Sequence, residues 1–324
     1  MQKSVAIVGA GVSGLTCGVL FVERGFRTTI FAEHIGTETT SGAAAALWFP
    51  YDAQPPEKVI PWALATYKVL VALAKDPHSG VSMIELQQFS RQREIETPEW
   101  IERLHTSWSK WDCSAVQRLT GGRKIFSSGF SMRVPLMDTT VYLHYLAQRF
   151  QKRGGEINAG LRLAELEDVD SQFDLVINCA GIGARELVHD IDLEPHRGQV
   201  AIVSKMDNLD RAIVCDDAPL MYAIPRTNDC VFGGTNEVSA DLVPDAETTK
   251  AIVAECSHVL EINKPRVIRE CVGLRPFRKS GVRLKSEKLS DGRTVIHNYG
   301  HGGSGFTLSW GCAHEVIELA KDLW

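Results

Sequence analysis

The first forty residues alternate between apolar runs and amphipathic stretches in the order strand, turn, helix and strand. Residues 5–8 form a continuous apolar run that is typical of a buried parallel strand, and apolar positions over 15–22 recur with helical spacing. Gly25 ends this helix, and residues 28–31 form the second strand. The pattern predicts that the chain opens with the first unit of a parallel α/β sheet.

The segment between residues 55 and 119 predicts mostly helix. Within it, 61–75 and 98–111 show helical periodicity, each with a proline at or near its start. A turn-rich bend over 119–132 follows, and then a capped amphipathic helix within 135–157, which two glycines end. We therefore expect this part of the chain to contribute mainly helices.

The second half of the chain is richer in short strands. Residues 173–187 repeat the opening order of buried strand, small residues and helix, and 294–300 has the character of a strand that returns to the first sheet. Between them, turn signals separate several β-prone runs, which fits an antiparallel sheet. The fold class predicted is α/β: a Rossmann-like domain on a parallel sheet, interleaved with an α+β domain built on a mainly antiparallel sheet. The β-prone runs are 198–203, 220–225, 230–235 and 264–277.

Composition narrows the possible classes of protein. The 324 residues include 23% charged and 44% hydrophobic residues, and the formal net charge is -5, with cations scattered along the chain, so we expect no nucleic-acid partner. The longest apolar window, 62–74, is too short and too polar to span a bilayer, so we expect no membrane association. Eight cysteines occur without a CxxC pair or metal-ligand spacing, so we expect a reduced, cytoplasmic protein without a metal site.

A glycine motif follows the first strand directly. Gly9, Gly11 and Gly14 form GxGxxG between a strand and a helix, and Glu33 ends the next strand. The first glycine suits a tight turn, the second lets a pyrophosphate approach the backbone, and the third allows close packing of helix and strand. A tight βα turn with a surface glutamate is the alternative. The acid disfavours NADP and leaves NAD and FAD open, because a carboxylate repels a 2′-phosphate.

Two further stretches suggest close approach of a ligand to the backbone. Residues 37–51 place small hydroxyl side chains before a run of small residues, although an alanine-rich helix start would look the same. Residues 297–311 contain five glycines and two histidines. We interpret these glycines as making room for a flat ligand, and the histidines as part of the scaffold.

The last of these stretches resembles a known family. Residues 295–313 are similar to the C-terminal signature of the D-amino acid oxidases, and the resemblance extends from Val5 to the last helix. It implies non-covalently bound FAD and the oxidation of a D-amino acid to an imino acid, which water hydrolyses to a 2-oxo acid and ammonium while O₂ is reduced to hydrogen peroxide. Further segments match that family in order: 42–51, 177–181, 197–199, 222–225 and 273–278.

The resemblance also implies the division of the chain. Two domains are interleaved, so that each is built from separate segments. The FAD-binding domain comprises 1–50, 133–190 and 284–324, and the substrate-binding domain comprises 51–132 and 191–283, including helical segments.

The resemblance implies a site without a catalytic acid or base, because hydride passes from the substrate Cα to flavin N5. The substrate carboxylate needs a cation, and Arg278 is matched to that position, with the Tyr222 hydroxyl as second donor. Arg275 and Arg283 are interpreted as structural or surface residues. The remaining substrate-binding residues implied are Leu47, Phe49, Gly303, whose carbonyl would receive the substrate amino group, and Thr307.

The FAD-binding residues implied by the resemblance fall in five segments of the chain. The phosphate loop and the ribose-binding acid come first, and the C-terminal glycine loop comes last. The full set is Gly9, Ala10, Gly11, Val12, Ser13, Gly14, Glu33, His34, Thr40, Ser41, Gly42, Ala45, Ala46, Leu47, Leu163, Cys179, Ala180, Gly181, Arg278, Gly302, Gly303, Ser304, Gly305, Phe306 and Thr307.

The chain departs from the animal pattern of the family between residues 214 and 222. This segment is short and lacks a second tyrosine, so we expect an open entrance without a long lid. Phe49 stands where animal enzymes have a polar residue, which favours neutral, apolar substrate side chains. D-aspartate is the alternative, with Arg226 as the one candidate for a second carboxylate. A glycine or sarcosine oxidase, an NAD-linked dehydrogenase and a homodimer are left open.

Overall fold

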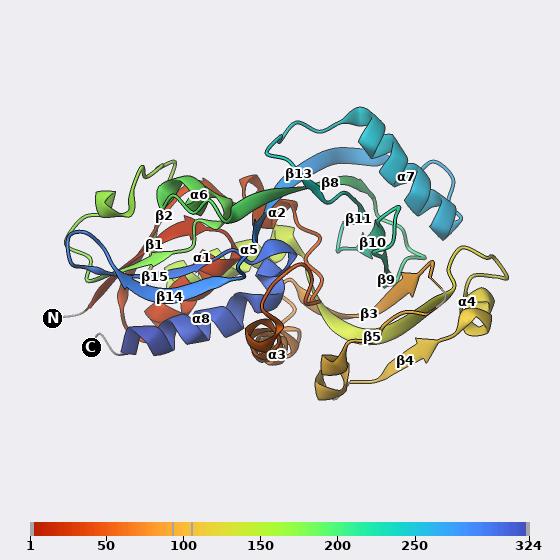
Figure 1. The fold of residues 1–324 in the computed structure, drawn as a ribbon, viewed down its shortest axis with the longest axis horizontal. Helices are drawn as coiled ribbons and strands as arrows, with labels where there is room; N and C mark the ends of the chain where they lie inside the picture. Colours follow the sequence, from red (N-terminus) through yellow and green to blue (C-terminus); the bar gives the residue numbers. More distant parts are fainter. Residues whose placement is uncertain (1–2, 93, 105, 322–324) are drawn as a thin grey trace.

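Two β-sheets lie side by side, and each is built from strands that are far apart in the sequence (Figure 1). The structure is a computed structural model, and it describes residues 3–92, 94–104 and 106–321. The first sheet has six strands in the order β14-β15-β7-β1-β2-β6, and all its pairs are parallel except β14 with β15. Its strands are β1 (Ser4–Ala10), β2 (Arg27–Ile35), β6 (Glu156–Ala159), β7 (Leu175–Asn178), β14 (Arg283–Lys288) and β15 (Thr294–Tyr299).

The second sheet has nine strands and is mainly antiparallel. Its order is β12-β8-β11-β10-β9-β3-β5-β4, and β13 pairs separately with β8; only β3 and β9 run parallel. The α/β fold class predicted from the sequence is thereby confirmed. The strands are β3 (Val81–Ser90), β4 (Trp108–Trp111), β5 (Ser128–Met137), β8 (Leu193–Ser204), β9 (Arg211–Cys215), β10 (Met221–Pro225), β11 (Asp229–Gly233), β12 (Glu237–Val238) and β13 (Val267–Arg278).

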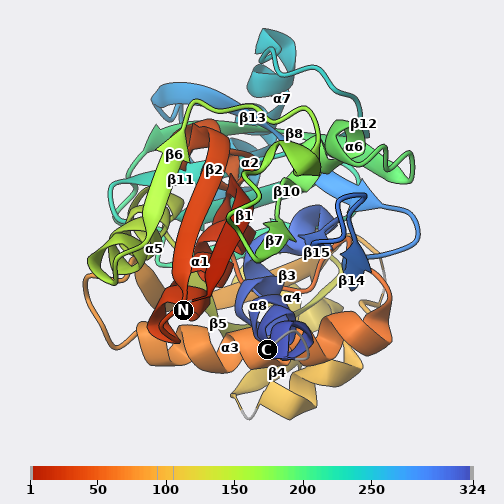
Figure 2. The ribbon, with the colours of Figure 1, turned by 90° about the vertical axis from the view of Figure 1, so that its left-hand side faces the viewer.

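Helices cover the first sheet, and Figure 2 views the molecule from that side. Helix α8 packs against both α1 and α3, and α5 packs against α1. The predicted helix within 135–157 is confirmed as α5. The helices are α1 (Val12–Glu23), α2 (Thr40–Ala43), α3 (Pro56–Leu73), α4 (Cys113–Leu119), α5 (Thr139–Lys152), α6 (Ala184–Leu187), α7 (Ala246–Leu260) and α8 (Gly305–Lys321).

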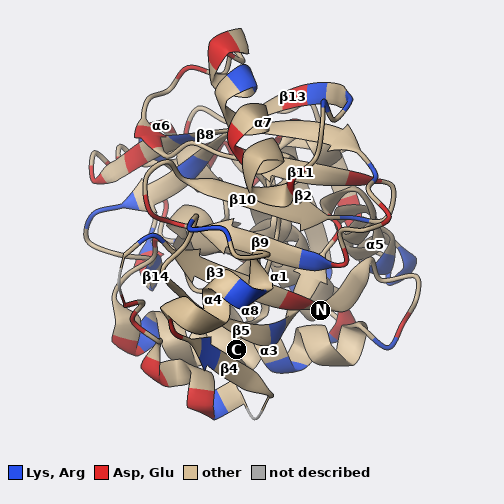
Figure 3. Cartoon of the chain, turned by 90° about the vertical axis from the view of Figure 1, so that its right-hand side faces the viewer, with Lys and Arg blue, Asp and Glu red and all other residues tan. Residues whose placement is uncertain are grey.

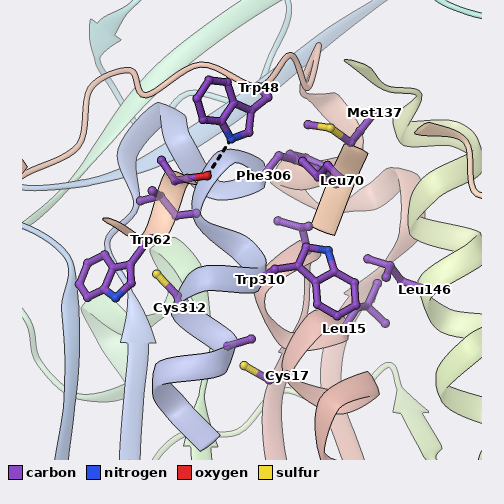
Figure 4. Close-up of a cluster of buried hydrophobic side chains, with 14 of the residues drawn as sticks. Leu15, Cys17, Trp48, Trp62, Leu70, Met137, Leu146, Phe306, Trp310 and Cys312 are labelled. Carbon is purple, nitrogen blue, oxygen red and sulfur yellow. Dashed lines mark hydrogen bonds between the residues drawn. The ribbon is translucent and has the colours of Figure 1, made fainter. Parts of the chain in front are cut away.

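The core between α8, α1 and α3 is built around tryptophans (Figure 4). Trp310 is 2% exposed, and its indole N–H donates to the Tyr142 hydroxyl at 2.8 Å. Trp48 is fully buried and donates to the Ala63 carbonyl at 3.1 Å. A buried indole N–H requires a hydrogen-bond partner, and both tryptophans have one, so both fill the core without an unsatisfied donor. Gly311 is needed on α8 because a Cβ there would lie 2.2 Å from the Trp62 carbonyl oxygen.

The prediction of mostly helix before residue 119 is wrong for two segments. Residues 81–90 form β3, and 98–111 form a 3-10 turn (Glu99–Leu104) and the strand β4 instead of one helix. The bend predicted at 119–132 gives way to β5 from Ser128. Strand β3 pairs with β5 along its whole length, so tertiary pairing overrides the local pattern.

Two of the expected domain boundaries fall inside strands. The boundary at 132/133 divides β5, and that at 283/284 divides β14 after its first residue. A strand cannot be split between domains without breaking its ladder, so we place these boundaries after Met137 and before Arg283. The division into two interleaved domains remains our proposal.

Charged residues of both signs are intermixed on the face shown in Figure 3. Within the described ranges, no helix is long and apolar enough to cross a membrane. The same part of the chain contains no group of three or more His, Cys, Asp or Glu side chains arranged to hold a metal ion. All eight cysteines are free thiols.

Candidate functional site

A cavity of about 1620 Å³ extends from the carboxyl ends of β1 and β2 to one face of the nine-stranded sheet. In open α/β sheets, ligands bind beyond the carboxyl ends of the strands. Small-molecule pockets commonly occupy about 300–1,000 Å³, so this cavity has room for a dinucleotide together with a small substrate.

The first end is the glycine turn between β1 and α1. Gly9 has φ +107°, and a Cβ there would lie 2.3 Å from the Cys179 carbonyl oxygen. A Cβ on Gly14 would lie 1.9 Å from the Gly9 carbonyl oxygen, so this glycine permits the close packing of helix and strand. Gly11 is the N-cap of α1 and makes no side-chain cap. The Val12 N–H at the start of this turn is taken by the Ser41 hydroxyl, and the N–H groups that follow it in the first turn are available to a phosphate at the cavity wall.

Two neighbouring groups complete this end of the cavity. The Ser41 hydroxyl accepts a hydrogen bond from Val12 N at 3.0 Å, which holds the 39–43 segment against the start of α1. Glu33 lines the cavity at the end of β2, and its carboxylate is exposed and lies 3.5 Å from an Arg162 guanidinium nitrogen. Glu33 is thus placed where a ribose hydroxyl could be bound.

The glycines of the C-terminal loop serve the chain more than a ligand. A Cβ on Gly302 would lie 1.8 Å from the Asp52 carbonyl oxygen, one on Gly303 would lie 2.5 Å from the Tyr51 ring, and one on Gly300 would lie 2.9 Å from Arg278 Cβ. These contacts give the three glycines an internal reason to lack a side chain, and their role in making room for a flat ligand stays a prediction. They let the loop fold tightly against the 51–52 segment and β13.

Two hydroxyls clip the 49–51 segment to the start of α8. Thr307 Oγ1 donates to the Phe49 carbonyl at 3.0 Å and accepts from Phe49 N at 3.1 Å. Ser304 Oγ makes the same pair of bonds with Tyr51, at 2.5 Å to the carbonyl and 2.7 Å from the N–H. Both hydroxyls are satisfied by backbone, so they position the cavity wall that Phe49 and Tyr51 form.

The second end of the cavity holds a tyrosine and an arginine. The Tyr222 ring lies over Gly233, where a Cβ would come within 2.0 Å of it. The guanidinium of Arg275 faces the Tyr222 hydroxyl, and burial raises the pKa of Tyr222, although Arg275 opposes the shift. The Arg275 guanidinium lies over Gly198, where the absence of a side chain leaves room for it. Its Nη1 donates to the Thr235 carbonyl at 3.0 Å. Among the described residues, no carboxylate lies within ion-pair distance of Arg275.

Arg278 is not part of the cavity wall. Its Nε donates to Asp190 Oδ2 at 2.9 Å, and its Nη2 lies 3.6 Å from Asp192 Oδ2. Its Nη1 donates to Ser280 Oγ and to the Gly281 carbonyl. The expectation that Arg278 holds a ligand is therefore wrong. Residues 275 and 278 are three apart on β13, so they face opposite sides of the strand. On the side that Arg278 faces, the carboxylates of Asp190 and Asp192 bind it.

The expected site residues divide clearly. Gly14, Gly42 and Ser304 also lie outside the cavity wall: Gly14 packs on Gly9, Gly42 on Gly36, and Ser304 on Tyr51. The expected residues that do line the cavity are Gly9, Ala10, Gly11, Val12, Ser13, Glu33, His34, Thr40, Ser41, Ala45, Ala46, Leu47, Phe49, Leu163, Cys179, Ala180, Gly181, Tyr222, Gly302, Gly303, Gly305, Phe306 and Thr307.

The sequence reasoning missed the contribution of β3 and β9. Leu86 and Gln88 on β3, Val214 on β9 and Tyr222 on β10 all line the cavity, because alternate residues of neighbouring strands face the same side of a sheet. Tyr51, Arg275 and Asp216 were missed as well. Arg275 stands in the same motif as Arg278, so only the strand's orientation could have separated the two.

Arg226, the candidate for a second substrate carboxylate, is fully engaged elsewhere. Its Nε and Nη2 donate to the two carboxylate oxygens of Asp229 at 2.7 and 2.9 Å, and its Nη1 donates to the Thr139 hydroxyl at 3.1 Å. The side chain is 2% exposed. Arg226 therefore joins β10 to α5 and does not reach the cavity wall.

A buried histidine predicts sensitivity to acid. His301 is 3% exposed, its Nε2 lies 3.0 Å from Asn298 Oδ1, and burial lowers its pKa to about 4. Because the unfolded chain takes up this proton near pH 6.5, the neutral form stabilises the fold above that pH and the benefit is lost between pH 6.5 and 4. The expected loss of unfolding free energy is roughly 3 kcal/mol.

Urea unfolding of the FAD-saturated protein at several pH values checks this expectation. The His301→Asn variant removes the titrating group, so its unfolding free energy should fall less steeply between pH 6.5 and 4. Equal slopes for the two proteins would show that His301 does not set the acid response. The stability that Asp190 contributes is lost only at lower pH, because its pKa is lowered to about 2.

The fold and the cavity define a dinucleotide-dependent enzyme with a binding loop on one sheet and a substrate chamber on the other. Comparison with known proteins makes this specific. The family model described as "FAD dependent oxidoreductase" (DAO) matches residues 4–319, so the chain belongs to this family. It is an oxidoreductase that uses FAD, as the relatives below also support.

Relatives match the chain over nearly its whole length. It is 38% identical over 319 residues to a D-amino-acid oxidase of Rubrobacter xylanophilus, covering 97% of this chain and 94% of the relative. It is 32% identical over 334 residues to the human D-aspartate oxidase, covering 98% and 94%. Among solved structures, glycine oxidase from Geobacillus kaustophilus superposes with a TM-score of 0.82 at 17% identity, over 99% of this chain and 95% of that one, which shows a shared fold.

The cavity fits FAD on its own observations. The uncapped N-terminus of α1 offers N–H groups to the diphosphate, and Glu33 offers a carboxylate to the ribose. The start of α8 reaches the cavity at Gly305 and Phe306. The positive end of this long helix suits the part of the flavin where negative charge collects on reduction.

Proposed function

We propose that the chain oxidises D-amino acids to 2-oxo acids, ammonium and hydrogen peroxide. The observation that carries this proposal is the pair of Arg275 and Tyr222 at the sheet end of the cavity, where a cation without a carboxylate partner faces a phenol. A planar guanidinium binds a carboxylate with two parallel hydrogen bonds. Relatives named D-amino-acid oxidase over the same length support the substrate class.

Each residue at this end has a task that its chemistry supports. Bound FAD supplies the acceptor for the hydride that leaves the substrate Cα. Arg275 neutralises the substrate carboxylate, and Tyr222, which its raised pKa keeps protonated, donates a second hydrogen bond. The Gly303 carbonyl lies in the cavity wall and is the proposed acceptor for the substrate amino group. We propose no general base, since removal of hydride leaves no Cα proton to abstract.

The apolar part of the wall favours the apolar atoms of a substrate side chain over a second carboxylate. Leu47 and Phe49 line it from one side, and Leu86 and Val214 line it from the nine-stranded sheet. D-aspartate is the weaker candidate, because Arg226 is occupied by Asp229 and a buried carboxylate without a partner is costly.

The compartment and assembly belong to the proposal as well. We place the protein in the cytoplasm, which eight free thiols support, because disulfides are rare there. We propose that it acts on small molecules and O₂ without nucleic acid or membrane. Sedimentation of the FAD-saturated protein would decide between a monomer and a homodimer.

The proposed activity is tested by peroxide release from purified, FAD-saturated protein. The panel contains D-alanine, D-valine, D-phenylalanine, D-aspartate, glycine and the L-enantiomers. We expect a yellow protein that oxidises the neutral D-amino acids and leaves the L-enantiomers untouched. Equal turnover of L- and D-alanine would refute the stereochemistry, and turnover of glycine alone would place the chain with the glycine oxidases in activity as well as fold.

A further inference from the structure

One carboxylate in the substrate part of the cavity has no part in the proposed chemistry. Asp216 follows β9 directly and lies two residues beyond Val214, so it continues the same face of the sheet. Its side chain lines the cavity, and Gln88 Nε2 donates to Oδ2 at 2.9 Å. Gln88 also lines the cavity.

Asp216 shares this part of the cavity with Arg275. The Tyr51 hydroxyl is within electrostatic range of both: burial raises the pKa of Tyr51, Asp216 raises it further, and Arg275 lowers it. Tyr51 itself lines the cavity and accepts a hydrogen bond from Asn236 at 3.2 Å. A substrate whose carboxylate is bound by Arg275 therefore lies in the field of Asp216.

The neighbouring charges do not neutralise Asp216. Asp217 adds a second negative charge, and its Oδ2 accepts from Ser90 Oγ at 2.7 Å and from Arg91 N at 2.5 Å. The Arg91 guanidinium pairs with Glu255 at 2.6 Å, on the side of α7. Within the described residues, no Lys or Arg lies within ion-pair distance of Asp216. Asp216 is exposed to solvent in the cavity, and the protein atoms around it, reinforced by the charge of Asp217, raise its pKa despite the hydrogen bond from Gln88.

We propose that Asp216 is a specificity-determining residue that selects D-amino acids with a cationic side chain and rejects those with an anionic one. The proposal rests on the proposed function and deepens it. The carboxylate and the side-chain cation of D-lysine or D-arginine are opposite in charge to Arg275 and Asp216, respectively. The apolar residues Leu86 and Val214 line the same cavity and suit the methylene chain. A second substrate carboxylate would face Asp216 with the same charge, which disfavours D-aspartate and D-glutamate.

The test compares substrates of equal length with and without charge. We expect kcat/KM for D-lysine to exceed that for D-norleucine by about fivefold, the size of effect that a solvent-exposed ion pair gives. The Asp216→Asn variant keeps the shape and the bond to Gln88 as far as an amide can. It should lower kcat/KM for D-lysine by about fivefold, leave kcat/KM for D-norleucine within about twofold and raise kcat/KM for D-glutamate.

The Asp217→Asn variant is the matched control, because its carboxylate binds Ser90 and the Arg91 backbone instead of facing the substrate. It should keep the ratio of D-lysine to D-norleucine. An equal fall of both substrates in Asp216→Asn would overturn the proposal, as would a wild-type protein that does not distinguish them. Failure of the proposed function is distinguishable, because D-alanine would then release no peroxide at all.

Discussion

Replacing Arg275 with alanine should lower kcat/KM for neutral D-amino acids by about 10³-fold. The variant loses a charge-assisted pair of hydrogen bonds to the substrate carboxylate, and truncation of one partner of such a pair costs about 2–5 kcal/mol. The loss should fall mainly on KM, because the carboxylate is bound in the ground state as well. The flavin spectrum and the FAD dissociation constant should stay close to wild type.

The measurement is steady-state peroxide release beside a fluorescence titration with FAD. Arg275→Lys is an informative partner variant: it keeps the charge but lacks the planar fork, so it should recover part of the loss. Unchanged kcat/KM in Arg275→Ala would remove this residue from the proposed carboxylate site. Equal losses of FAD and substrate affinity would make it a structural residue.

Replacing Arg278 with alanine should instead destabilise the protein, by about 2 kcal/mol, with a fall in Tm of several degrees. Burial alone would raise the pKa of Asp190, but hydrogen bonds from Tyr299 and Arg278 outweigh it and lower that pKa to about 2. Removing Arg278 leaves Asp190 with Tyr299 at 2.6 Å and Arg283 at 3.3 Å, so the buried charge keeps part of its compensation. The full cost of an unpaired buried charge, about 3–5 kcal/mol, is therefore not expected.

Thermal unfolding at saturating FAD checks this value, and Lys279→Ala is its control. Lys279 is the next residue and makes a surface ion pair with Glu194, which should contribute less than about 1 kcal/mol. If Arg278→Ala kept the wild-type Tm and its KM rose strongly, then Arg278, and not Arg275, would be the residue that binds the substrate carboxylate.

The difference between these arginines shows where sequence reasoning stopped. The sequence matches segment 273–278 to the family, but it predicts Arg278 as the carboxylate-binding residue and Arg275 as a structural or surface residue. Which side meets the cavity depends on Asp190, almost ninety residues earlier, and on Gly198, which leaves room for the Arg275 guanidinium. No local pattern records either contact.

The two sheets also differ in how far the sequence predicts them. The first βα turn was predictable, because Gly9, Gly11 and Gly14 satisfy local backbone demands that the structure shows directly. Strand β3 was not, because Gln87 and Gln88 are polar and yet only 6% and 5% exposed. Gln88 is satisfied by Asp216, which directly follows β9, so its burial follows from tertiary contacts that a periodicity search cannot detect.

The position of β15 and α8 in the sequence has a consequence for the order of events during synthesis. Strand β15 lies between β7 and β14 in the first sheet, and the loop that follows it supplies Gly302, Gly303 and Phe306 to the cavity wall. Domains commonly fold as they emerge from the ribosome, N-terminal part first. Here the phosphate-binding turn is made early and the opposite wall last. We therefore expect FAD to bind tightly only after residues 294–307 have been translated, because the cavity lacks the wall that they supply until then.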